Sequence, residues 1–162
     1  MSAAGQLAVD VQIACCDSGV PQQSEIHDWI RLAIRESGHA LGGRSEIVVR
    51  VVDDEEIREL NRQYRQQDKA TNVLSFPAGA VAGLPDSEGT VLGDIVICAS
   101  VVRAEAQAQQ KLLEDHWAHM LIHGTLHLLG LDHEEQAAAV EMESLEAQIL
   151  ARRGISDPYA SR

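Results

Sequence analysis

A run of histidines within an apolar segment constrains the fold of this chain more than any other feature. Residues His116–Glu134 read HWAHMLIHGTLHLLGLDHE, and four of the chain's seven histidines fall within the first twelve positions: His116, His119, His123 and His127. The residues around them are mostly apolar. A helix that is apolar nearly all round must be covered on every side. The sequence therefore predicts a buried central helix that opens at Leu112 and carries the histidines.

Three of the histidines have the spacing of a metal site. His123 and His127 lie one turn apart on the same helix face, where two imidazoles can reach one ion. Gly130 can adopt the left-handed conformation that ends a helix, and the chain could then turn back and bring His133 to that face. Neutral imidazoles suit zinc, and three protein ligands leave a fourth position for water. We therefore expect His123, His127 and His133 to bind one divalent ion, with zinc as the expected metal.

The two remaining histidines of this helix leave the ligand assignment open on spacing alone. His116 and His119 both fall within about 40° of His123 on the helical wheel, because seven residues make nearly two turns. Either side chain could be an alternative ligand, or could support a ligand from behind.

The motif of the zinc proteases is only partly present. The sequence H-E-x-x-H places a glutamate, the general base, directly after the first histidine. Gly124 occupies that position here. Asp132 and Glu134 are acidic neighbours, but either could simply orient an imidazole. Peptide hydrolysis is therefore disfavoured.

Helices and strands alternate along the rest of the chain. Apolar alternation and short apolar runs predict strands at about 7–14, 47–52, 73–76 and 92–98. Helices are expected from about 21–24 to 38, from 53 onward, from 101 to about 110, and from about 135 to 153. This pattern predicts a single α+β domain, with a mixed sheet of about four strands covered by helices and the histidine helix packed against it.

Two of these helices carry specific expectations. In the helix that begins at Asp53, the predicted buried stripe consists of Ile57, Leu60 and Tyr64. On its outer side, Arg58 and Arg62 are interpreted as an ordinary solvated face. Ser100 is the expected N-cap of the helix after strand 92–98.

The strand at 92–98 contains a charged residue. Asp94 would be costly there unless paired, so it should lie on an edge or face a site. Before this strand, the segment PAGAVAGLPDSEGT is rich in glycine and proline and is predicted to be a mobile loop.

Length and composition limit the class of protein. The 162 residues favour one domain spanning 1–162. No long apolar run occurs, and the amino terminus lacks a basic segment followed by an apolar one, so neither a membrane span nor a secretory signal is expected. The three cysteines have no metal-ligand spacing, and their odd number suits a reducing cytoplasm.

The net charge argues against a general RNA-binding module. It is −12 at neutral pH, whereas phosphate attraction normally supplies much of the affinity for nucleic acid. Aromatic residues make up only 3% of the chain, so a base-stacking platform is not expected either. Any RNA must therefore meet a local basic patch or be delivered by a larger assembly.

Three sequence blocks resemble one protein family. HGTLHLLGLDH, ending at His133, resembles the H-G-x-L-H-L-x-G-x-D-H signature of the YbeY family, bacterial endoribonucleases of ribosomal RNA maturation. LNRQYRQQDKATNVLSFP, from Leu60 to Pro77, and LGDIVIC, from Leu92 to Cys98, resemble the family's other two blocks in the same order. The resemblance covers about residues 47–159. Ala70 departs from it, because the family often carries proline there.

The resemblance implies an activity and a further site residue. It implies a metal-dependent, single-strand-specific endoribonuclease that matures the 3′ end of small-subunit ribosomal RNA and acts in ribosome quality control. It places a functional arginine at Arg65, whose guanidinium could clamp a phosphate and stabilise the added charge of the transition state. It also carries an aspartate at Asp94. The ion would lower the pKa of a bound water and polarise a phosphoryl oxygen.

The expected partners follow from the same resemblance. They are ribosomal RNA and ribosomal particles, with ribosomal proteins as further candidates, and neither DNA nor a membrane. Two other functions remain open. A ribosome assembly factor with a mainly structural metal would use its acidic charge to dock basic ribosomal proteins. A metallohydrolase of peptides or small molecules is the second, and Gly124 counts against it.

Overall fold

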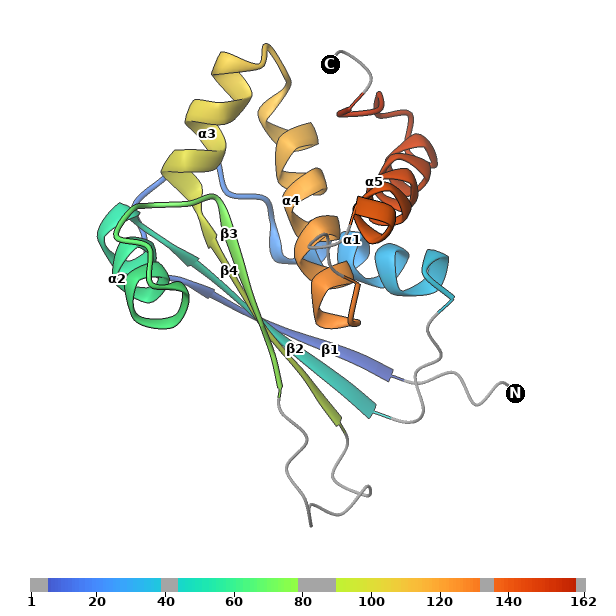
Figure 1. Ribbon diagram of the computed structural model, residues 1–162, viewed down its shortest axis with the longest axis horizontal. Coiled ribbons are helices and arrows are strands. Elements are labelled where there is room, and N and C mark those ends of the chain that lie inside the picture. The colour runs from blue at the N-terminus through green and yellow to red at the C-terminus, as the bar shows by residue number, and fades with distance from the viewer. Residues whose placement is uncertain (1–5, 39–43, 79–89, 132–135, 160–162) are drawn as a thin grey trace.

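A four-stranded mixed sheet lies at the centre of the fold (Figure 1). The computed structural model describes residues 6–38, 44–78, 90–131 and 136–159. The strands are β1 (Gln6–Ile13), β2 (Arg44–Val52), β3 (Val73–Pro77) and β4 (Thr90–Cys98). Their spatial order is β1-β2-β4-β3, with β1, β2 and β4 parallel and β3 antiparallel to β4. The predicted strands and the mixed character of the sheet are confirmed.

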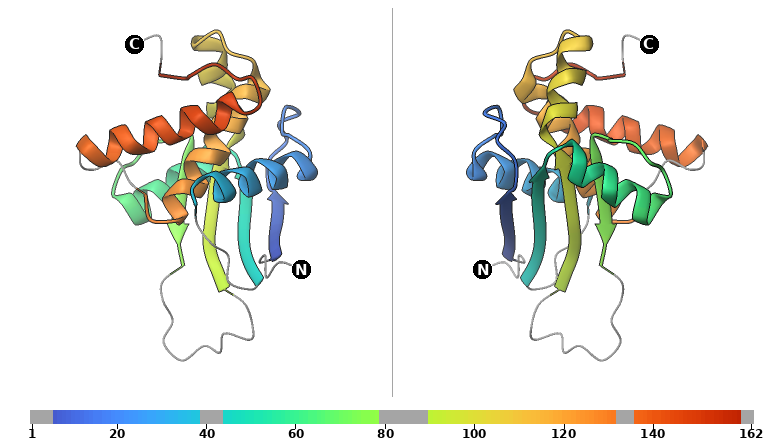
Figure 2. Two further views of the ribbon diagram at one scale, coloured as in Figure 1. Left: turned by 90° about the vertical axis from the view of Figure 1, so that its right-hand side faces the viewer. Right: turned by 90° about the vertical axis from the view of Figure 1, so that its left-hand side faces the viewer.

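Helices cover both faces of this sheet. The helices α1 (Gln23–Glu36), α4 (Leu113–Leu128) and α5 (Gln136–Ala151) lie on one side, and α2 (Asp54–Arg65) lies on the other (Figure 1). The helix α3 (Ala99–Ala108) follows β4 directly. The views in Figure 2 show α2 crossing the face of the sheet near β3 and β4. The α+β class is confirmed.

The alternation of each strand divides its side chains between two apolar layers. Toward α1 and α4, the sheet contributes β-branched residues that are all fully buried: Ile47, Val49, Val51, Ile95 and Ile97. Toward α2, it contributes Val52, Leu74, Val96 and Cys98, which pack with Ile57 of that helix. The inner strands β2 and β4 therefore bury both of their faces toward their carboxyl ends, whereas β1 is only partly buried.

The histidine-bearing helix α4 is buried on nearly all sides. Trp117 and Leu121 face the core formed with α1 and the sheet. Ala118, Ile122 and Leu126 face a second core formed with α1 and α5. Because α4 lies between the sheet and α5, its apolar circumference has partners all round, and the predicted buried central helix is confirmed.

The end of α4 follows the predicted geometry. Gly130 has a φ of +97°, so it adopts the left-handed conformation that stops the helix. The backbone N–H of Leu131 then donates to the carbonyl of Leu126 at 3.1 Å. His133, Asp132 and Glu134 lie outside the described residues, as does most of the predicted loop before β4.

Two local predictions are wrong. Tyr64 is 59% exposed rather than part of the buried stripe of α2. Its ring stands edge-on to Phe76, with the ring centroids 5.3 Å apart. Because β3 is an edge strand, Phe76 covers one side of the Tyr64 ring and solvent reaches the other. The buried polar position of α2 is Asn61 instead.

The predicted cap of α3 is the second error. The helix begins at Ala99, with Cys98 at the N-cap position and no side-chain capping bond. Ser100 therefore lies inside the first turn, and its hydroxyl donates to the carboxylate of Asp54 instead.

In the described part of the chain, no helix is both long enough and apolar enough to cross a membrane.

Candidate functional site

The last two turns of α4 bring His123 and His127 to the surface of the molecule. Their ring centroids are 4.7 Å apart, at an interplanar angle of 72°. Both side chains are half-buried, while most of the residues around them on α4 are buried. Two imidazoles one turn apart and partly open to solvent can both reach a single ion.

These two histidines line a cleft of about 350 Å³. The opposite wall comes from the end of α2, the segment that follows it and β3, and consists of Asn61, Arg65, Gln67, Lys69, Thr71, Asn72, Val73, Leu74 and Ser75. Seven of these nine side chains are polar or basic. The cleft therefore combines imidazoles on one wall with cations and hydrogen-bonding groups on the other.

Arg65 enters the cleft at the carboxyl end of α2. Gln66 follows it in the left-handed conformation, with a φ of 58°, and stops the helix there. Nη2 of Arg65 donates to the carbonyl of Ser75 at 3.3 Å. The structure thus brings Arg65 together with His123 and His127, three of the four residues that the sequence singled out.

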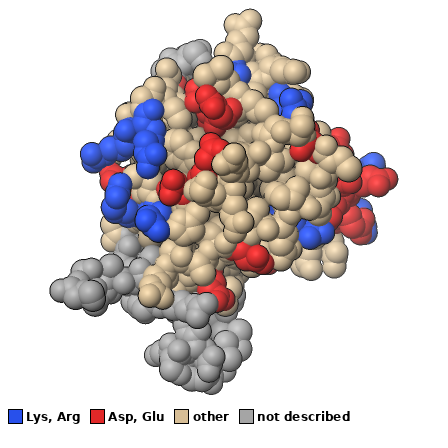
Figure 3. Space-filling model, turned by 180° about the vertical axis from the view of Figure 1, so that it is seen from behind, with Lys and Arg blue, Asp and Glu red and all other residues tan. Residues whose placement is uncertain are grey.

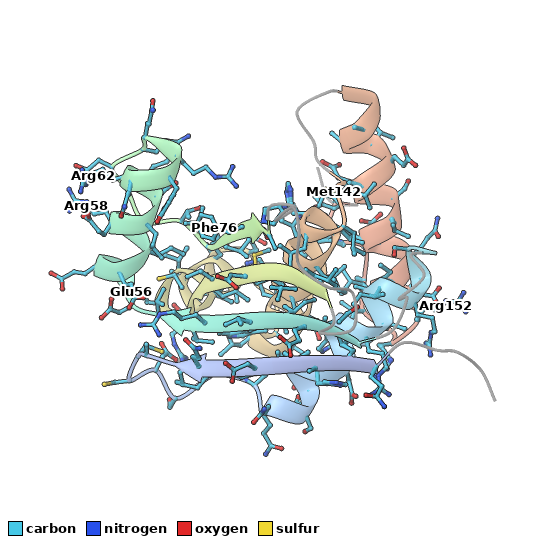
Figure 4. All side chains as sticks on the ribbon, turned by 90° about the horizontal axis from the view of Figure 1, so that it is seen from below. Glu56, Arg58, Arg62, Phe76, Met142 and Arg152 are labelled. Carbon is cyan, nitrogen blue, oxygen red and sulfur yellow. The ribbon has the colours of Figure 1, made fainter. Side chains whose placement is uncertain are left out.

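The segment after α2 is held in place by contacts with the helix. The side-chain amide of Asn61 donates to the carbonyl of Lys69 at 2.9 Å. Arg58 forms an ion pair with Asp68 at 2.7 Å. Arg62 pairs with Glu59, and both arginines point away from the sheet (Figure 4), as the sequence predicted. These contacts fix the backbone that presents Lys69 to the cleft.

The two cations of the cleft differ from most others in the chain. Six arginines form ion pairs with carboxylates: Arg35, Arg50, Arg58, Arg62, Arg103 and Arg152. Among the described residues, no carboxylate lies within 4.0 Å of the charged groups of Arg65 or Lys69. Their charge is therefore available to an anion that enters the cleft.

Gly124 faces the sheet rather than the cleft. A Cβ atom at this position would lie 2.9 Å from Cγ2 of Ile95 and 3.3 Å from Oγ of Ser75. The hydroxyl of Ser75 also donates to the carbonyl of Gly124 at 3.0 Å, which joins β3 to α4. A longer side chain at this position would have to displace the side chains of the sheet that it meets. The packing of Gly124 against these side chains therefore disfavours a general base of the zinc-protease type at this position.

Behind the cleft, His123 contacts a buried carboxylate that the sequence reasoning missed. Nδ1 of His123 lies 2.7 Å from Oε2 of Glu146, and Nε2 of His119 lies 2.7 Å from Oε1 of the same side chain. Glu146 belongs to α5 and is fully buried. One signal was available: Glu146 falls between Met142 and Ile149 in the apolar stripe of α5, where a solvated glutamate does not belong.

The protonation of this cluster follows from its contacts. Burial alone would raise the pKa of Glu146, but the hydrogen bonds from His119 and His123 lower that pKa to about 2. Burial lowers the pKa of His119, and the hydrogen bond to Glu146 opposes this effect. Glu146 is therefore an anion at neutral pH, and each imidazole places an N–H toward it.

The residues present fit a metal ion. A histidine whose Nδ1 is bonded to a carboxylate coordinates metals through Nε2, with the ring orientation fixed by that bond. His123 has this arrangement, and His127 lies one turn away. A second set of potential ligand atoms, in His119, His123 and Glu146, lies within 4.8 Å of one another. The cleft and the buried cluster therefore share His123.

The remaining predicted positions lie elsewhere. Asp94 is in the inner strand β4 and is exposed, so it is not at a sheet edge. It lines a hollow with Arg50, Glu56 and Tyr64 near α2, on the other face of the sheet from α4. His116 is buried and lies 2.9 Å, through Nε2, from Oε1 of Glu105. Neither residue reaches the cleft directly.

The fold and the cleft define a small α+β protein in which two imidazoles face an arginine across a polar groove. The family model described as Endoribonuclease YbeY matches residues 12–154. Proteins named Endoribonuclease YbeY from Psychromonas ingrahamii and Stutzerimonas stutzeri are each 50% identical to this chain, over 157 and 155 residues. These matches cover 96% and 94% of this chain and 98% and 92% of the two relatives. The chain belongs to the YbeY endoribonuclease family.

A solved structure supports the fold. A protein from Thermotoga maritima, determined in solution, superposes with a TM-score of 0.51 and covers 93% of this chain and 98% of its own. The two sequences are 23% identical. At this identity the likeness shows a shared fold and nothing of the activity.

Proposed function

We propose that this protein is a metal-dependent, single-strand-specific endoribonuclease. One observation carries the proposal: the cleft brings the imidazoles of His123 and His127 together with the guanidinium of Arg65, in a chain that belongs to an endoribonuclease family. Phosphodiester cleavage adds negative charge to the phosphate in the transition state, and fixed cations stabilise that charge. The cleft supplies such cations on one wall and ligands for an ion on the other.

Arg65 binds and orients the phosphate at the cleavage site. A guanidinium offers five N–H donors in a planar fork, which matches two phosphate oxygens. The bond from Nη2 to the Ser75 carbonyl restricts the side chain to the cleft wall and leaves its other donors for the phosphate. Lys69, on the same wall, binds a neighbouring phosphate of the RNA strand.

His123, His127 and His133 hold one divalent ion, with zinc as the proposed metal. Three neutral imidazoles are a common ligand set of catalytic zinc. When bound, the ion supplies Lewis-acid chemistry to the phosphate and its attacking oxygen.

Local charge reconciles RNA binding with the acidic chain. On the face drawn in Figure 3, basic side chains gather along one edge, acidic side chains lie across the middle, and the opposite edge carries both. Arg65 and Lys69 instead stand without carboxylate partners among the described residues. A single RNA strand that follows the cleft therefore meets attraction where cleavage occurs and repulsion over much of the remaining surface. This arrangement favours a short contact with unpaired RNA.

The biological substrate is ribosomal RNA, specifically the 3′ end of small-subunit RNA, together with defective ribosomal particles. Family membership supports this assignment, and the net charge of −12 suits delivery to RNA by contact with basic ribosomal proteins. The reaction takes place in the cytoplasm within one domain spanning 1–162. The unpaired thiols of Cys15, Cys16 and Cys98 fit a reducing compartment.

A cleavage assay tests the proposal. Single-stranded RNA and a duplex of the same sequence are incubated with the wild-type protein, with protein treated with a chelator, and with Arg65→Ala. We expect cleavage of the single strand only, its loss on chelation, its return on addition of Zn²⁺, and strong impairment in Arg65→Ala. Binding to ribosomal particles without any RNA cleavage would instead favour an assembly factor.

A further inference from the structure

We propose that Glu146 is the positioning residue of the candidate metal site, holding His123 in the one tautomer and ring orientation that present Nε2 to the cleft. His119 and Tyr159 serve to hold the carboxylate of Glu146 in place. This inference rests on the proposed function, because it concerns the ligand role of His123.

The carboxylate of Glu146 uses both of its oxygens within the protein core. Oε2 accepts from Nδ1 of His123 at 2.7 Å. Oε1 accepts from Nε2 of His119 at 2.7 Å and from the hydroxyl of Tyr159 at 2.5 Å. Three donors, two from α4 and one from the segment after α5, therefore converge on one fully buried carboxylate. A buried carboxylate with this many donors has little freedom to rotate.

These bonds determine which ring nitrogen of His123 carries the proton. Both oxygens of Glu146 accept hydrogen bonds in this arrangement, so Nδ1 of His123 is the nitrogen that carries a proton. The neutral imidazole then carries its lone pair on Nε2. His123 also lines the cleft, and its ring lies beside that of His127. Glu146 thus selects the tautomer that a metal ligand in the cleft needs.

His119 takes the opposite tautomer, which removes it from the cleft site. Its Nε2 points to Glu146, and its Nδ1 is buried with no hydrogen-bond partner in the described structure. Tyr159 stands edge-on to the His119 ring, with centroids 5.4 Å apart, and its hydroxyl lies 3.1 Å from Nε2. The segment after α5 therefore closes over the cluster.

The alternative is that His119, His123 and Glu146 bind an ion directly. Ligand atoms about 2.0–2.2 Å from a tetrahedral zinc ion lie roughly 3.3–3.6 Å from one another. The nitrogen atoms of His119 and His123 each lie 2.7 Å from a Glu146 oxygen, which is the separation of a charge-assisted hydrogen bond. Full burial of Glu146 also keeps water and substrate away from its carboxylate. The geometry favours support of a ligand.

The test compares matched glutamate substitutions on α5. Glu146→Gln keeps the size of the side chain but gives one oxygen position an N–H₂ group, which cannot accept from a histidine. Glu141→Gln makes the same change at an exposed position of the same helix and is the control. Zn²⁺ affinity is measured by competition with a chromophoric chelator. We expect Glu146→Gln to bind Zn²⁺ roughly 10–100-fold more weakly and Glu141→Gln to bind like the wild type.

A spectroscopic readout separates positioning from simple loss of stability. Nitrogen-15 NMR of the metal-free protein identifies the protonated nitrogen of each imidazole. We expect His123 to carry its proton on Nδ1 in the wild type and in Glu141→Gln, and to become a tautomer mixture in Glu146→Gln. If Glu146→Gln does not fold, Tyr159→Phe removes one donor to the same carboxylate and should weaken Zn²⁺ binding severalfold. Unchanged affinity together with an unchanged His123 tautomer would overturn the proposal.

Direct binding of an ion by His119, His123 and Glu146 would give a different pattern of Zn²⁺ affinities. If His119→Ala abolishes Zn²⁺ binding as completely as His127→Ala, or His127→Ala retains it fully, the buried cluster is itself the metal site and the positioning role is wrong. Because the tautomer of His123 is read without metal or RNA, it can be tested even if the wild type fails to cleave RNA. Failure of the proposed nuclease activity and failure of this inference are therefore distinguishable.

Discussion

Ser75 joins Arg65 to the histidine helix. Its carbonyl accepts from Nη2 of Arg65 at 3.3 Å, and its hydroxyl donates to the carbonyl of Gly124 at 3.0 Å. Gly124 lies directly after His123 in α4. One residue of β3 therefore fixes the guanidinium and the imidazole wall relative to each other. These two hydrogen bonds hold the two walls of the cleft at a fixed distance from each other.

The role of Arg65 can be separated from that of its neighbours on α2. We expect Arg65→Ala to reduce kcat/KM for single-stranded RNA roughly 10²–10³-fold, because a fixed donor to the transition-state charge is lost. Arg62→Ala is the matched control, since Arg62 pairs with Glu59 and does not line the cleft. Steady-state cleavage kinetics check both variants. Equal effects of the two substitutions would refute the assignment.

Lys69 should affect RNA binding through its charge. In Lys69→Ala, the slope of log Kd against log salt concentration should become shallower by about 0.7, the value for one phosphate contact to a single strand. Fluorescence anisotropy of a labelled RNA, measured with chelated protein so that no cleavage occurs, gives this slope. An unchanged slope would mean that Lys69 contacts no phosphate.

The substitution Gly124→Ala tests whether helix propensity or packing decides the stability of the fold at this position. Within an exposed helix, Gly→Ala stabilises a protein by roughly 0.5–1 kcal/mol. Here the added Cβ would lie 2.9 Å from Cγ2 of Ile95, so we expect Gly124→Ala to destabilise the fold by about 1–3 kcal/mol. Urea denaturation followed by circular dichroism measures the change. A stabilised variant would show that α4 is not pressed against the sheet at this position.

Ionisation of Glu105 should make the free energy of unfolding depend on pH in the acid range. Its hydrogen bond with His116 lowers the pKa of Glu105 below the ordinary value of 4.5, burial opposes this, and Asn72 in the cleft wall adds a further bond. A lowered pKa in the folded state means that Glu105 stabilises the fold above pH 4.5 and that this contribution is lost as the pH falls through the folded-state pKa.

The difference in unfolding free energy between the wild type and Glu105→Gln should therefore be largest from about pH 5 to 7 and shrink on further acidification. Urea titrations at a series of pH values measure it. A difference in unfolding free energy that grows as the pH falls would have the wrong sign. It would exclude the hydrogen bond between Glu105 and His116 as its source.

The elements of the fold were predictable where local pattern decides them. The strand alternation at Ile47, Val49 and Val51 and the apolar surroundings of the α4 histidines depend on residue type and spacing alone. Tyr64 was wrongly expected to be buried, because its spacing from Ile57 is helical but β3 ends the sheet beside it. Spacing along a helix does not reveal where its tertiary cover stops.

The candidate site was predictable only in part. The spacing of His123 and His127 and the family resemblance at Arg65 pointed to residues that the structure brings into one cleft. Glu146 escaped prediction because its partners His123 and His119 lie 23 and 27 residues away, on another helix. Gly124 appeared in the sequence only as a missing glutamate, whereas the packing of Ile95 explains why the position is small.

We propose that His123, His127 and His133 hold one ion on which RNA cleavage depends. The most direct test measures zinc per chain by mass spectrometry, alongside single-stranded RNA cleavage, in the wild type, His127→Ala and the control Glu141→Gln. We expect about one ion per chain in the wild type and the control, and loss of both metal and cleavage in His127→Ala. Full metal content in His127→Ala, or cleavage that survives removal of the metal, would contradict it.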